Sequence, residues 1–516
     1  MEKKKIRVRF APSPTGGLHI GGLRTALFNY LYASKYKGDF ILRIDNTDKK
    51  RNIKKSIQYI LKSLDWCKIK YNEGYNKKSS KYGPYIQSKR INIYKKYIKK
   101  LIKNKLAYYA FDSKKDLKLY KKNPNFIYNS LTRKNLKNSL NFNKKKINYY
   151  KKKKNYVIRI KTPSKTNITF IDKIYGKIKI NSRNIDDKIL FKSNNIPTYH
   201  FATVIDDHLM KISHIIRGKE WLTSTSIHIL LYKFFNWKIP QYIHLPLILN
   251  YNNKGKISKR NPDNELPIYP IKSDYKLIKI KNSYQEKGFY PEVFFYILAS
   301  LGWSPKLKEY SNKFLEKKKI IKLFKLNNLN KSNIHLNYKK FCWINKQYIN
   351  NKKYKKKVNI KLLNFLKKKL KNLKIKINKK KLKKIINLTK NRIYLINDIW
   401  DVTYYFFIDP KNFNIIDKIK TQLLNKYIIK KIKLFFKKIK LFFKKKYKKN
   451  NIYILNKLIK KIKNNYSILF LKLLRLSIVG ELTGIDIVNI LFLIKKKIII
   501  KRINFFLKQI IYQYKI

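Results

Sequence analysis

Residues 7–32 of this chain read RVRFAPSPTGGLHIGGLRTALFNYLY, and this stretch decides the fold of the N-terminal part. Apolar residues alternate at its start, which predicts a short buried strand. Two prolines and a glycine pair follow, and they predict a tight loop at the end of that strand. From Leu23 onward, apolar side chains recur every three or four residues, which indicates a helix. The stretch therefore predicts a strand, a glycine-rich loop and a helix, in that order.

The loop places His19, Gly21 and Gly22 at the N-terminus of the expected helix. Free backbone N–H groups and the positive end of the helix dipole attract phosphate there, and glycine allows a ligand to approach the backbone. His19 can also donate a hydrogen bond to a phosphate oxygen. Alone, such a pattern is more often an ordinary loop than a nucleotide site.

A second stretch, KISKR at residues 256–260, favours a nucleotide site. It follows an apolar, strand-like segment and a turn that contains Gly255. Lys256 and Lys259 flank Ser258, and two such lysines on a flexible loop can place positive charge on a departing pyrophosphate.

Four segments together resemble a bacterial glutamyl-tRNA synthetase, a member of the class I aminoacyl-tRNA synthetases. They are APSPTGGLHIGG at residues 11–22, YHFATVIDDHLM at 199–210, IIRGKEWLTSTSIHILLY at 215–232, and KISKR. These motifs are highly specific, and the resemblance extends over residues 6–349. Beyond that point it is limited to composition.

The resemblance and the coarse sequence pattern predict an α/β fold with a Rossmann-like parallel-sheet catalytic domain. We expect the first half of this domain in residues 1–106 and the second half, with the KISKR loop, in residues 191–261. In this family an α+β unit inserted between the halves, here residues 107–190, contacts the acceptor end of the tRNA. A helical connector (262–349) follows, and then an all-α anticodon-binding domain (350–516).

The predicted terminal domain rests on its periodicity. Apolar residues recur there at helical spacing with lysines between them, while alternating strand patterns are scarce. A helical domain therefore fits better than a β-barrel. The longest helices predicted in it cover residues 415–443 and 468–506.

Arg217 closes an otherwise apolar strand, and a buried guanidinium binds a carboxylate through two parallel hydrogen bonds. A structural ion pair is the more common role for such an arginine. By resemblance, Arg217 holds the γ-carboxylate of L-glutamate, with Arg9 placed to help. A glutaminyl enzyme carries cysteine in place of Arg217 and aspartate in place of His200, so this chain matches a glutamate enzyme at both positions. Glutamine would leave a buried guanidinium unpaired, which opposes its binding.

The resemblance also implies residues around the rest of the substrate. Ala11 and Tyr199 belong to the amino-acid pocket, and Ser13 bonds the α-amino or carboxylate end. Three positions depart from the family. Asp45 replaces a glutamate that holds the substrate ammonium group, Asn46 replaces an aspartate and so loses a charge, and Thr203 replaces an asparagine. Asp45 keeps the charge but is one methylene shorter, so a backbone shift or a bridging water would have to cover the gap.

ATP would enter with Mg²⁺ bound through its phosphates. The run Asp206-Asp207-His208 suggests a metal site, but in the family this run is scaffold beside the substrates. Some family members carry a cysteine-rich zinc site, whereas this chain has two distant cysteines, Cys67 and Cys342. We therefore expect no structural zinc.

The 516 residues include 125 Lys and Arg against 27 Asp and Glu, a formal net charge of +98. Such a charge favours polyanionic partners such as tRNA. Lys, Asn, Ile and Tyr also fill most permissive positions, which indicates drift toward A/T-rich codons and a largely solvated surface charge. No signal peptide fits the first residues, and no charge-free apolar run is long enough to span a membrane. We expect a cytoplasmic monomer without membrane contact.

These observations predict a glutamate–tRNA ligase. The enzyme would convert L-glutamate and ATP to glutamyl-AMP and pyrophosphate, and would then transfer the glutamyl group to the 3′-terminal adenosine of tRNA(Glu), releasing AMP. Three alternatives are open. A non-discriminating enzyme would also charge tRNA(Gln), a truncated relative would modify a tRNA base, and a basic RNA-binding descendant would have lost catalysis. The length of the chain argues against the second, and the intact motifs argue against the third.

Overall fold

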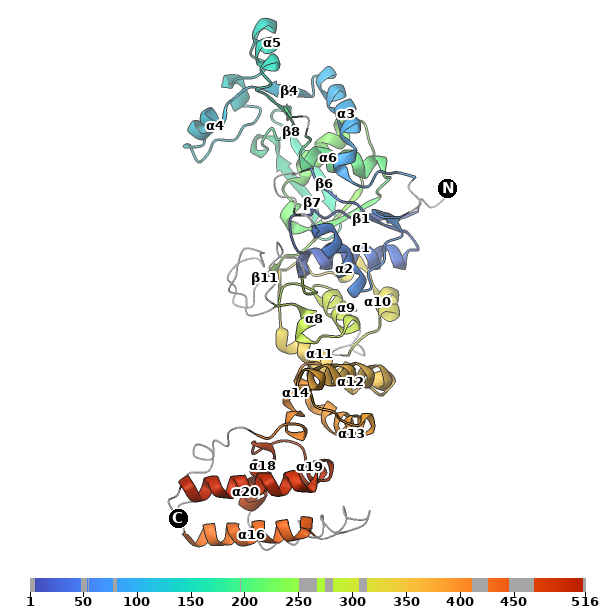
Figure 1. Ribbon diagram of the computed structural model, residues 1–516. Helices are drawn as coiled ribbons and strands as arrows, with labels where there is room; N and C mark the ends of the chain where they lie inside the picture. The colour runs from blue at the N-terminus through green and yellow to red at the C-terminus, as the bar shows by residue number, and fades with distance from the viewer. Residues whose placement is uncertain are drawn as a thin grey trace. The chain divides into compact units, whose positions relative to one another are not determined.

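The computed structural model describes residues 5–47, 53, 55–77, 81–194, 196–249, 267–273, 282–305, 313–410, 426–444 and 468–513. The KISKR loop, with Lys256, Ser258 and Lys259, lies outside these residues. The chain divides into two compact units, Met1–Ile344 and Asn345–Ile516. Figure 1 shows both units and labels many of their elements.

The opening stretch forms the strand, loop and helix that its sequence predicts. β1 (Arg7–Phe10) is buried along its whole length, and α1 (Ile20–Lys35) returns the chain to the parallel strand β2 (Asp39–Leu42). α2 (Ser56–Trp66) leads on to β3 (Glu73–Gly74), which pairs with β2 in parallel. Strands that alternate with helices in this way build a doubly wound α/β domain.

A second parallel pair forms the other half of the catalytic region. β9 (His214–Gly218) and β10 (Gln241–Leu245) pair in parallel, with α7 (Thr225–Phe234) as their connection. β9 lies beside β1, because the Ser213 N–H donates to the Arg7 carbonyl over 3.0 Å. The two parallel sheets therefore meet edge to edge, and the predicted α/β class with parallel sheets is confirmed.

The segment predicted as an inserted unit divides between two sheets. β4 (Ala107–Ala110), β5 (Val157–Ile160) and β8 (Ile189–Lys192) form an antiparallel sheet of their own. β6 (Asn167–Asp172) instead pairs in parallel with β10, and β7 (Gly176–Asn181) pairs with β6. The segment thus adds an edge to the catalytic sheet, while its predicted boundaries stay a prediction.

Helices complete the N-terminal unit. The rings of Phe28 on α1 and Phe324 stack with centroids 5.7 Å apart, so the helical segment after the catalytic sheet packs back onto the first helix. α11 then carries the chain from the first unit into the second. These helices are α3 (Ile91–Lys103), α4 (Lys114–Tyr120), α5 (Lys144–Lys152), α6 (Tyr199–Leu209), α8 (Tyr284–Lys287), α9 (Pro291–Ser300), α10 (Lys317–Leu323) and α11 (Tyr338–Asn350).

The C-terminal unit is helical in its described part, as its periodicity predicts. Its longer helices are α12 (Lys355–Asn372), α13 (Lys379–Thr389), α16 (Lys426–Lys444), α18 (Ile468–Val479), α19 (Ile487–Leu493) and α20 (Lys496–Gln513). The prediction of a single helix over residues 468–506 is wrong, because three helices cover this segment. Gly480 and Gly484 have φ angles of 84° and 144°, and this backbone conformation ends α18 before α19 begins.

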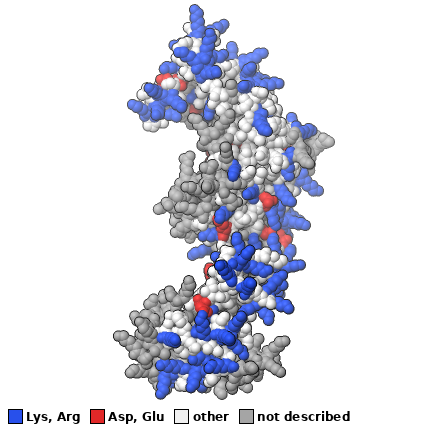
Figure 2. Space-filling view, viewed as in Figure 1, with Lys and Arg blue, Asp and Glu red and all other residues white. Residues whose placement is uncertain are grey.

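α16 shows why lysine-rich helices fold here. Ile432, Phe435, Phe436 and Ile439 are fully buried on one side of it, while lysines such as Lys437 stand exposed on the other. Lysine and arginine side chains accordingly cover much of the visible surface over α16 and α20 (Figure 2). The apolar stripe makes the core, and the lysines keep the opposite face in solvent.

A buried ion cluster joins the two halves of the catalytic region. Arg43, which follows β2, is fully buried, and its guanidinium bonds Asp45 and Asp207 over 2.7 Å each. Arg9 on β1 bonds the same Asp207 oxygen over 3.0 Å. Arg90 bonds Asp206 over 2.6 Å. Because the arginines come from the first half and two of the aspartates from α6, the cluster holds the halves together across the insertion.

The Asp206-Asp207-His208 run is therefore scaffold, as the family resemblance implies. Asp206 also accepts from the Tyr94 hydroxyl over 2.8 Å and from the Gln87 amide over 3.0 Å. His208 points elsewhere and stacks on Trp237 with ring centroids 3.7 Å apart. Among the residues that the structure describes, no group of three or more His, Cys, Asp or Glu is placed to hold a metal ion.

Replacing Arg43 by methionine should destabilise the N-terminal unit severely. Removing the arginine leaves the carboxylates of Asp45 and Asp207 buried with less compensation, and breaking such a buried pair costs about 3–5 kcal/mol. Urea unfolding followed by circular dichroism measures the effect. Lys99→Met is the matched control, because Lys99 is exposed on α3. Equal unfolding midpoints for the two variants would contradict this role of the cluster.

Candidate active site

The glycine-rich turn orients His19 at the start of α1. The His19 Nδ1 accepts a hydrogen bond from the Gly21 N–H over 3.0 Å. A neutral ring that accepts at Nδ1 carries its proton on Nε2, so His19 presents a donor at the far side of the ring. Phosphate oxygens accept such donors, and the turn therefore suits the role predicted for it.

Both predicted glycines leave no room for a side chain. A Cβ on Gly21 would lie 2.9 Å from Cε1 of His19, and one on Gly22 would lie 2.7 Å from Cδ1 of Leu18. Glycine at residue 21 is thus what allows the His19 ring to fold back onto the helix N-terminus.

A cavity of about 130 Å³ lies against this turn. His19, Gly21 and Gly22 line one side of it, and Gly218 and Pro246 line the other. Gly218 directly follows Arg217 on β9. The predicted nucleotide turn and the predicted amino-acid site are therefore adjacent at the carboxyl ends of the parallel strands, where α/β sheets bind ligands.

Arg217 is buried, with 5% of its surface exposed, and it is surrounded by neutral acceptors. Its Nε donates to His244 Nε2 over 3.0 Å, and its Nη2 donates to the Thr225 hydroxyl over 2.8 Å. Its Nη1 donates to His228 Nδ1 over 3.2 Å. Among the described residues no carboxylate lies within 4 Å of this guanidinium. The structural ion pair considered from the sequence is thus not formed within this part of the chain.

The histidines beside Arg217 are neutral. An arginine has no acceptor atom, so His228 must accept at Nδ1 and carry its proton on Nε2, which lies 3.0 Å from His200 Nδ1. Burial, together with the nearby charges of Lys188 and Arg217, lowers the pKa of His200 to about 4. Burial, followed by the charge of Arg217, also lowers the pKa of His228 well below its ordinary value.

Asp45 is bonded by Arg43, and its predicted role toward the substrate ammonium group stays a prediction. Its two oxygens accept from Arg43, over 2.7 Å and 3.2 Å, and the Thr203 hydroxyl lies 3.4 Å from one of them. The Asp45 carboxylate thus forms an ion pair with Arg43, which lies two residues away in the chain. Burial, partly offset by the charge of Arg43, raises the pKa of Asp45 to about 6.

The other predicted pocket residues lie at the same edge of the sheet. Ala11 follows β1 and is half-buried, while Ser13 is exposed in the loop beyond it. Tyr199 begins α6, and its ring lies against Trp221 with centroids 4.4 Å apart. Arg9 uses its Nε for Asp207. Their individual roles in binding stay predictions.

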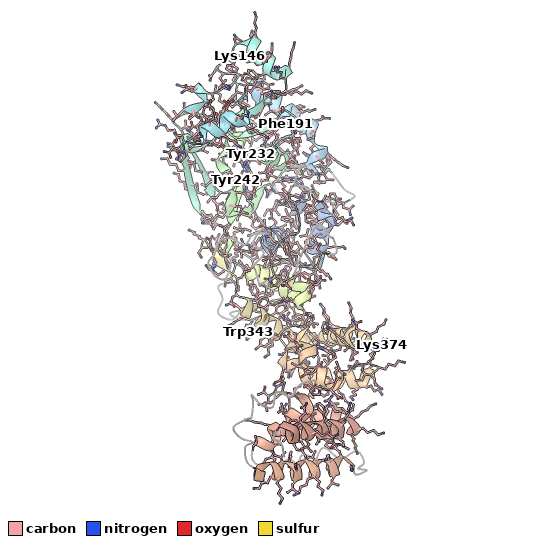
Figure 3. The ribbon with its side chains drawn as sticks, turned by 60° about the vertical axis from the view of Figure 1, so that its left-hand side comes forward. Lys146, Phe191, Tyr232, Tyr242, Trp343 and Lys374 are labelled. Atoms are coloured by element: carbon pink, nitrogen blue, oxygen red, sulfur yellow. The ribbon has the colours of Figure 1, made fainter. Side chains whose placement is uncertain are left out.

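Sequence reasoning missed Tyr242. It is buried beside Tyr232 within the N-terminal unit (Figure 3), and its hydroxyl has no hydrogen-bond partner. Its ring lies 5.4 Å from the Arg217 guanidinium carbon. A buried hydroxyl that finds no partner among the described residues is costly, so its place beside Arg217 fits a pocket that a polar ligand completes.

Two of the histidines around Arg217 also escaped prediction as site residues, although the sequence carried a signal for them. His228 and His244 each interrupt an otherwise apolar segment. A polar residue buried in such a segment needs a partner, and here Arg217 is the partner of both.

A larger cavity of about 730 Å³ lies beside this pocket. His200 and Trp221 line it from the catalytic half, and Tyr128, Arg159 and Lys188 line it from the segment predicted as the insertion.

The described helices include none that is long and apolar enough to cross a membrane.

Gly21→Ala should weaken ATP use, because the added methyl group would push the His19 ring away from the helix N-terminus. We expect the KM for ATP to rise about 10-fold, comparable to the loss of one hydrogen bond to a charged group. Steady-state kinetics with varied ATP measure it. Gly176→Ala is the control for backbone strain alone, because an added methyl group there meets no atom but the φ angle of 80° disfavours a side chain. An unchanged KM in Gly21→Ala would argue against a role of this turn in ATP binding.

Stability should fall as the pH drops from 6.5 toward 4. The pKa of His200 is lowered to about 4 in the folded chain, whereas an unfolded histidine titrates near 6.5, so in this window the unfolded state binds more protons. Urea unfolding across this range gives the slope. His200→Asn should flatten it by at most about 1.4 kcal/mol per pH unit. His335→Asn, at an exposed position, should leave the slope unchanged, and equal slopes for both variants would refute the assignment.

Comparison with known proteins agrees with this geometry. Residues 5–343 match the family described as tRNA synthetases class I (E and Q), catalytic domain, and residues 361–507 match an anticodon binding domain. Glutamate–tRNA ligases of Christiangramia forsetii and Azobacteroides pseudotrichonymphae are 41% and 43% identical to the chain, over 80% of it and 81% of each relative. The crystal structure of a glutamate tRNA ligase from Elizabethkingia meningosepticum in complex with its amino acid matches with a TM-score of 0.85 and 35% identity, over 98% of this chain and 99% of that one. The chain therefore belongs to the glutamate–tRNA ligase family of class I aminoacyl-tRNA synthetases.

Proposed function

We propose that this protein activates L-glutamate with ATP and transfers it to the 3′-terminal adenosine of tRNA(Glu). The observation that carries the proposal is the charge of Arg217. The guanidinium is buried, its described neighbours within hydrogen-bond distance are neutral, and it adjoins the His19 turn. A buried positive charge in this state is stabilised by an anionic ligand of matching shape, and a carboxylate matches the guanidinium fork.

The same arrangement supports selection of glutamate over glutamine. The γ-carboxylate brings a negative charge that compensates Arg217, whereas the glutamine amide brings none. Glutamine would also turn an N–H group toward the guanidinium donors, and a buried donor left without an acceptor is penalised. Glutamate is therefore the amino acid that this pocket favours.

The reaction proceeds by positioning and charge stabilisation. The α-carboxylate oxygen of glutamate forms a bond to the α-phosphorus of ATP while the bond to pyrophosphate breaks. A ribose hydroxyl of the tRNA then attacks the activated carbonyl carbon, and AMP leaves with the bonding electron pair. His19 donates from Nε2 to a phosphate oxygen, and Lys256 and Lys259, with Ser258 between them, act on the leaving pyrophosphate.

ATP is expected to enter as its Mg²⁺ complex. The described residues contain no cluster of carboxylates and histidines fit to cage a metal ion, so the phosphates of ATP would supply the ligands. We further propose that the protein binds no structural zinc and acts as a cytoplasmic monomer. Cys67 is buried and Cys342 is partly exposed, and two cysteines so far apart in the sequence do not make the ligand set of a zinc site.

The C-terminal unit supports tRNA as the polyanionic partner. Lysines line the exposed side of α16, among them Lys430, Lys433, Lys437 and Lys438. Such a face binds phosphate groups with a strong dependence on salt. Which tRNAs it accepts is decided by the charging experiment, because a discriminating and a non-discriminating enzyme would share the same amino-acid pocket.

Aminoacylation with labelled glutamate, in parallel with tRNA(Glu) and tRNA(Gln), tests the proposal. Charging of tRNA(Glu) alone supports a discriminating ligase, and charging of both supports the non-discriminating alternative. Arg217→Gln should lower kcat/KM for glutamate on the order of 100-fold, because losing one partner of a buried charged pair costs about 2–5 kcal/mol.

Lys233→Gln is the control, since Lys233 is exposed on α7. Failure of the wild-type protein to charge either tRNA, with tRNA still bound, would favour a non-catalytic RNA-binding protein. Equal kcat/KM in the Arg217 and Lys233 variants would show that Arg217 does not hold the substrate.

A further inference from the structure

A carboxylate stands one ring away from Arg217. The Asp172 Oδ2 accepts from His244 Nδ1 over 2.7 Å, and His244 Nε2 accepts from Arg217 Nε over 3.0 Å. Asp172 and His244 are both fully enclosed. Asp172 is the last residue of β6. The pairing of β6 with β10 places Asp172 beside Tyr242, and Tyr242 precedes His244 by two residues on β10.

The protons in this chain of contacts are fixed by its ends. Arg217 can only donate, so Nε2 of His244 must be the acceptor and the ring proton must be on Nδ1. Nδ1 then donates its proton in a hydrogen bond to Oδ2 of Asp172. The carboxylate therefore selects the tautomer of His244 that Arg217 requires.

We propose that Asp172 and His244 are positioning residues that hold the Arg217 guanidinium in register for the substrate γ-carboxylate, an inference that rests on the proposed function. A guanidinium has five N–H donors, and Arg217 commits three of them to His244, His228 and Thr225 over 3.2 Å or less. A longer contact of 3.4 Å joins Nη2 to the Trp221 carbonyl. These bonds fix the plane of the fork while leaving donor capacity on the η nitrogens.

Asp172 contacts the Arg217 guanidinium only through His244, and this separation has a consequence for substrate binding. A carboxylate bonded directly to Arg217 would occupy the donors that the substrate needs and would compensate its charge permanently. Placed behind His244, Asp172 orients the arginine without competing for those donors. Arg43 shows the opposite arrangement, because its carboxylate partners bond it directly.

Asp172 also has a structural role that the test must separate. Its Oδ1 accepts from the N–H groups of Ile174 and Tyr175 over 2.9 Å and 3.0 Å, which closes the turn between β6 and β7. Asp172→Asn can keep this turn with its amide oxygen. Its NH₂ group then faces His244 Nδ1 and moves the ring proton to Nε2, so that His244 Nε2–H and the Arg217 Nε–H become two donors facing each other. The same NH₂ group also faces the backbone N–H of residue 244, which donates to Oδ2 over 3.1 Å in the wild type.

The experiment is a double-mutant cycle on residues 172 and 244. Asp172→Asn should raise the KM for glutamate about 10- to 100-fold, as expected for a lost hydrogen bond to a charged group, with the KM values for ATP and tRNA unchanged. His244→Gln offers Arg217 an amide oxygen that needs no help from residue 172. In that background, Asp172→Asn loses only its contacts with backbone groups, so it should change the glutamate KM several-fold less than in the wild type.

Equal effects of Asp172→Asn in the two backgrounds would show that the residue acts only through its contacts with backbone N–H groups, and would overturn the proposal. An unchanged glutamate KM, or a fall in kcat alone, would overturn it as well. Charging by the wild-type protein reports separately on the proposed function, so a failure of that function and a failure of this inference give different results.

The tautomer itself can be measured without any substrate. The chain has 7 histidines, so a protein labelled with ¹⁵N-histidine gives a tractable spectrum, and His244→Gln assigns the signal. His244 should be protonated on Nδ1 in the wild type and on Nε2 in Asp172→Asn. An Nε2-protonated His244 in the wild-type protein would contradict the proposal, whatever the activity.

Discussion

A buried arginine that has no carboxylate partner among the residues described by the structure is the constraint on which the active-site half of this protein depends. Arg9, Arg43 and Arg90 are buried too, but each bonds an aspartate directly. Arg217 is bonded instead by two histidines and a threonine, and its charge is left for a ligand. Burying a charge in this way is costly, and it is sustained because His244, His228 and Thr225 each accept a hydrogen bond from the guanidinium.

The fold supplies that orientation from segments that are far apart in the chain. β9 carries Arg217, β10 carries His244 in register with it, and α7 carries His228. The last contribution comes from β6, which belongs to the segment between the two halves of the catalytic region. The segment predicted as an insertion therefore supports the proposed amino-acid pocket, and it also lines the larger cavity. A rigid second layer of this kind is what holds a binding group within the tolerance that selectivity needs.

Much of this could be predicted from the residues alone. The strand, loop and helix at residues 7–32 follow from local periodicity and turn chemistry, and Arg217 was identified by a charge at the end of an apolar strand. Both are local signals. The partner of His244 could not be predicted, since nothing in the sequence near Asp172 indicates that β6 pairs with β10.

Two further features could not be predicted from residue spacing. The side chain of Asp45 is held by Arg43, and its predicted role toward the substrate ammonium group stays a prediction. The helix predicted over 468–506 is divided, because periodicity continues across Gly480 and Gly484 while their backbone conformation does not. Residue spacing does not show which partner a side chain contacts. It also says little about where a glycine adopts a positive φ angle.

The most direct test of this account is a crystal structure of the protein with a non-hydrolysable glutamyl-adenylate analogue. The account predicts that the γ-carboxylate of the analogue bonds the η nitrogens of Arg217, that His228 and His244 keep their bonds to the same guanidinium, and that the phosphate lies at the His19 turn. A γ-carboxylate bound elsewhere, or an Arg217 that is paired with a carboxylate of the protein itself in that complex, would contradict it.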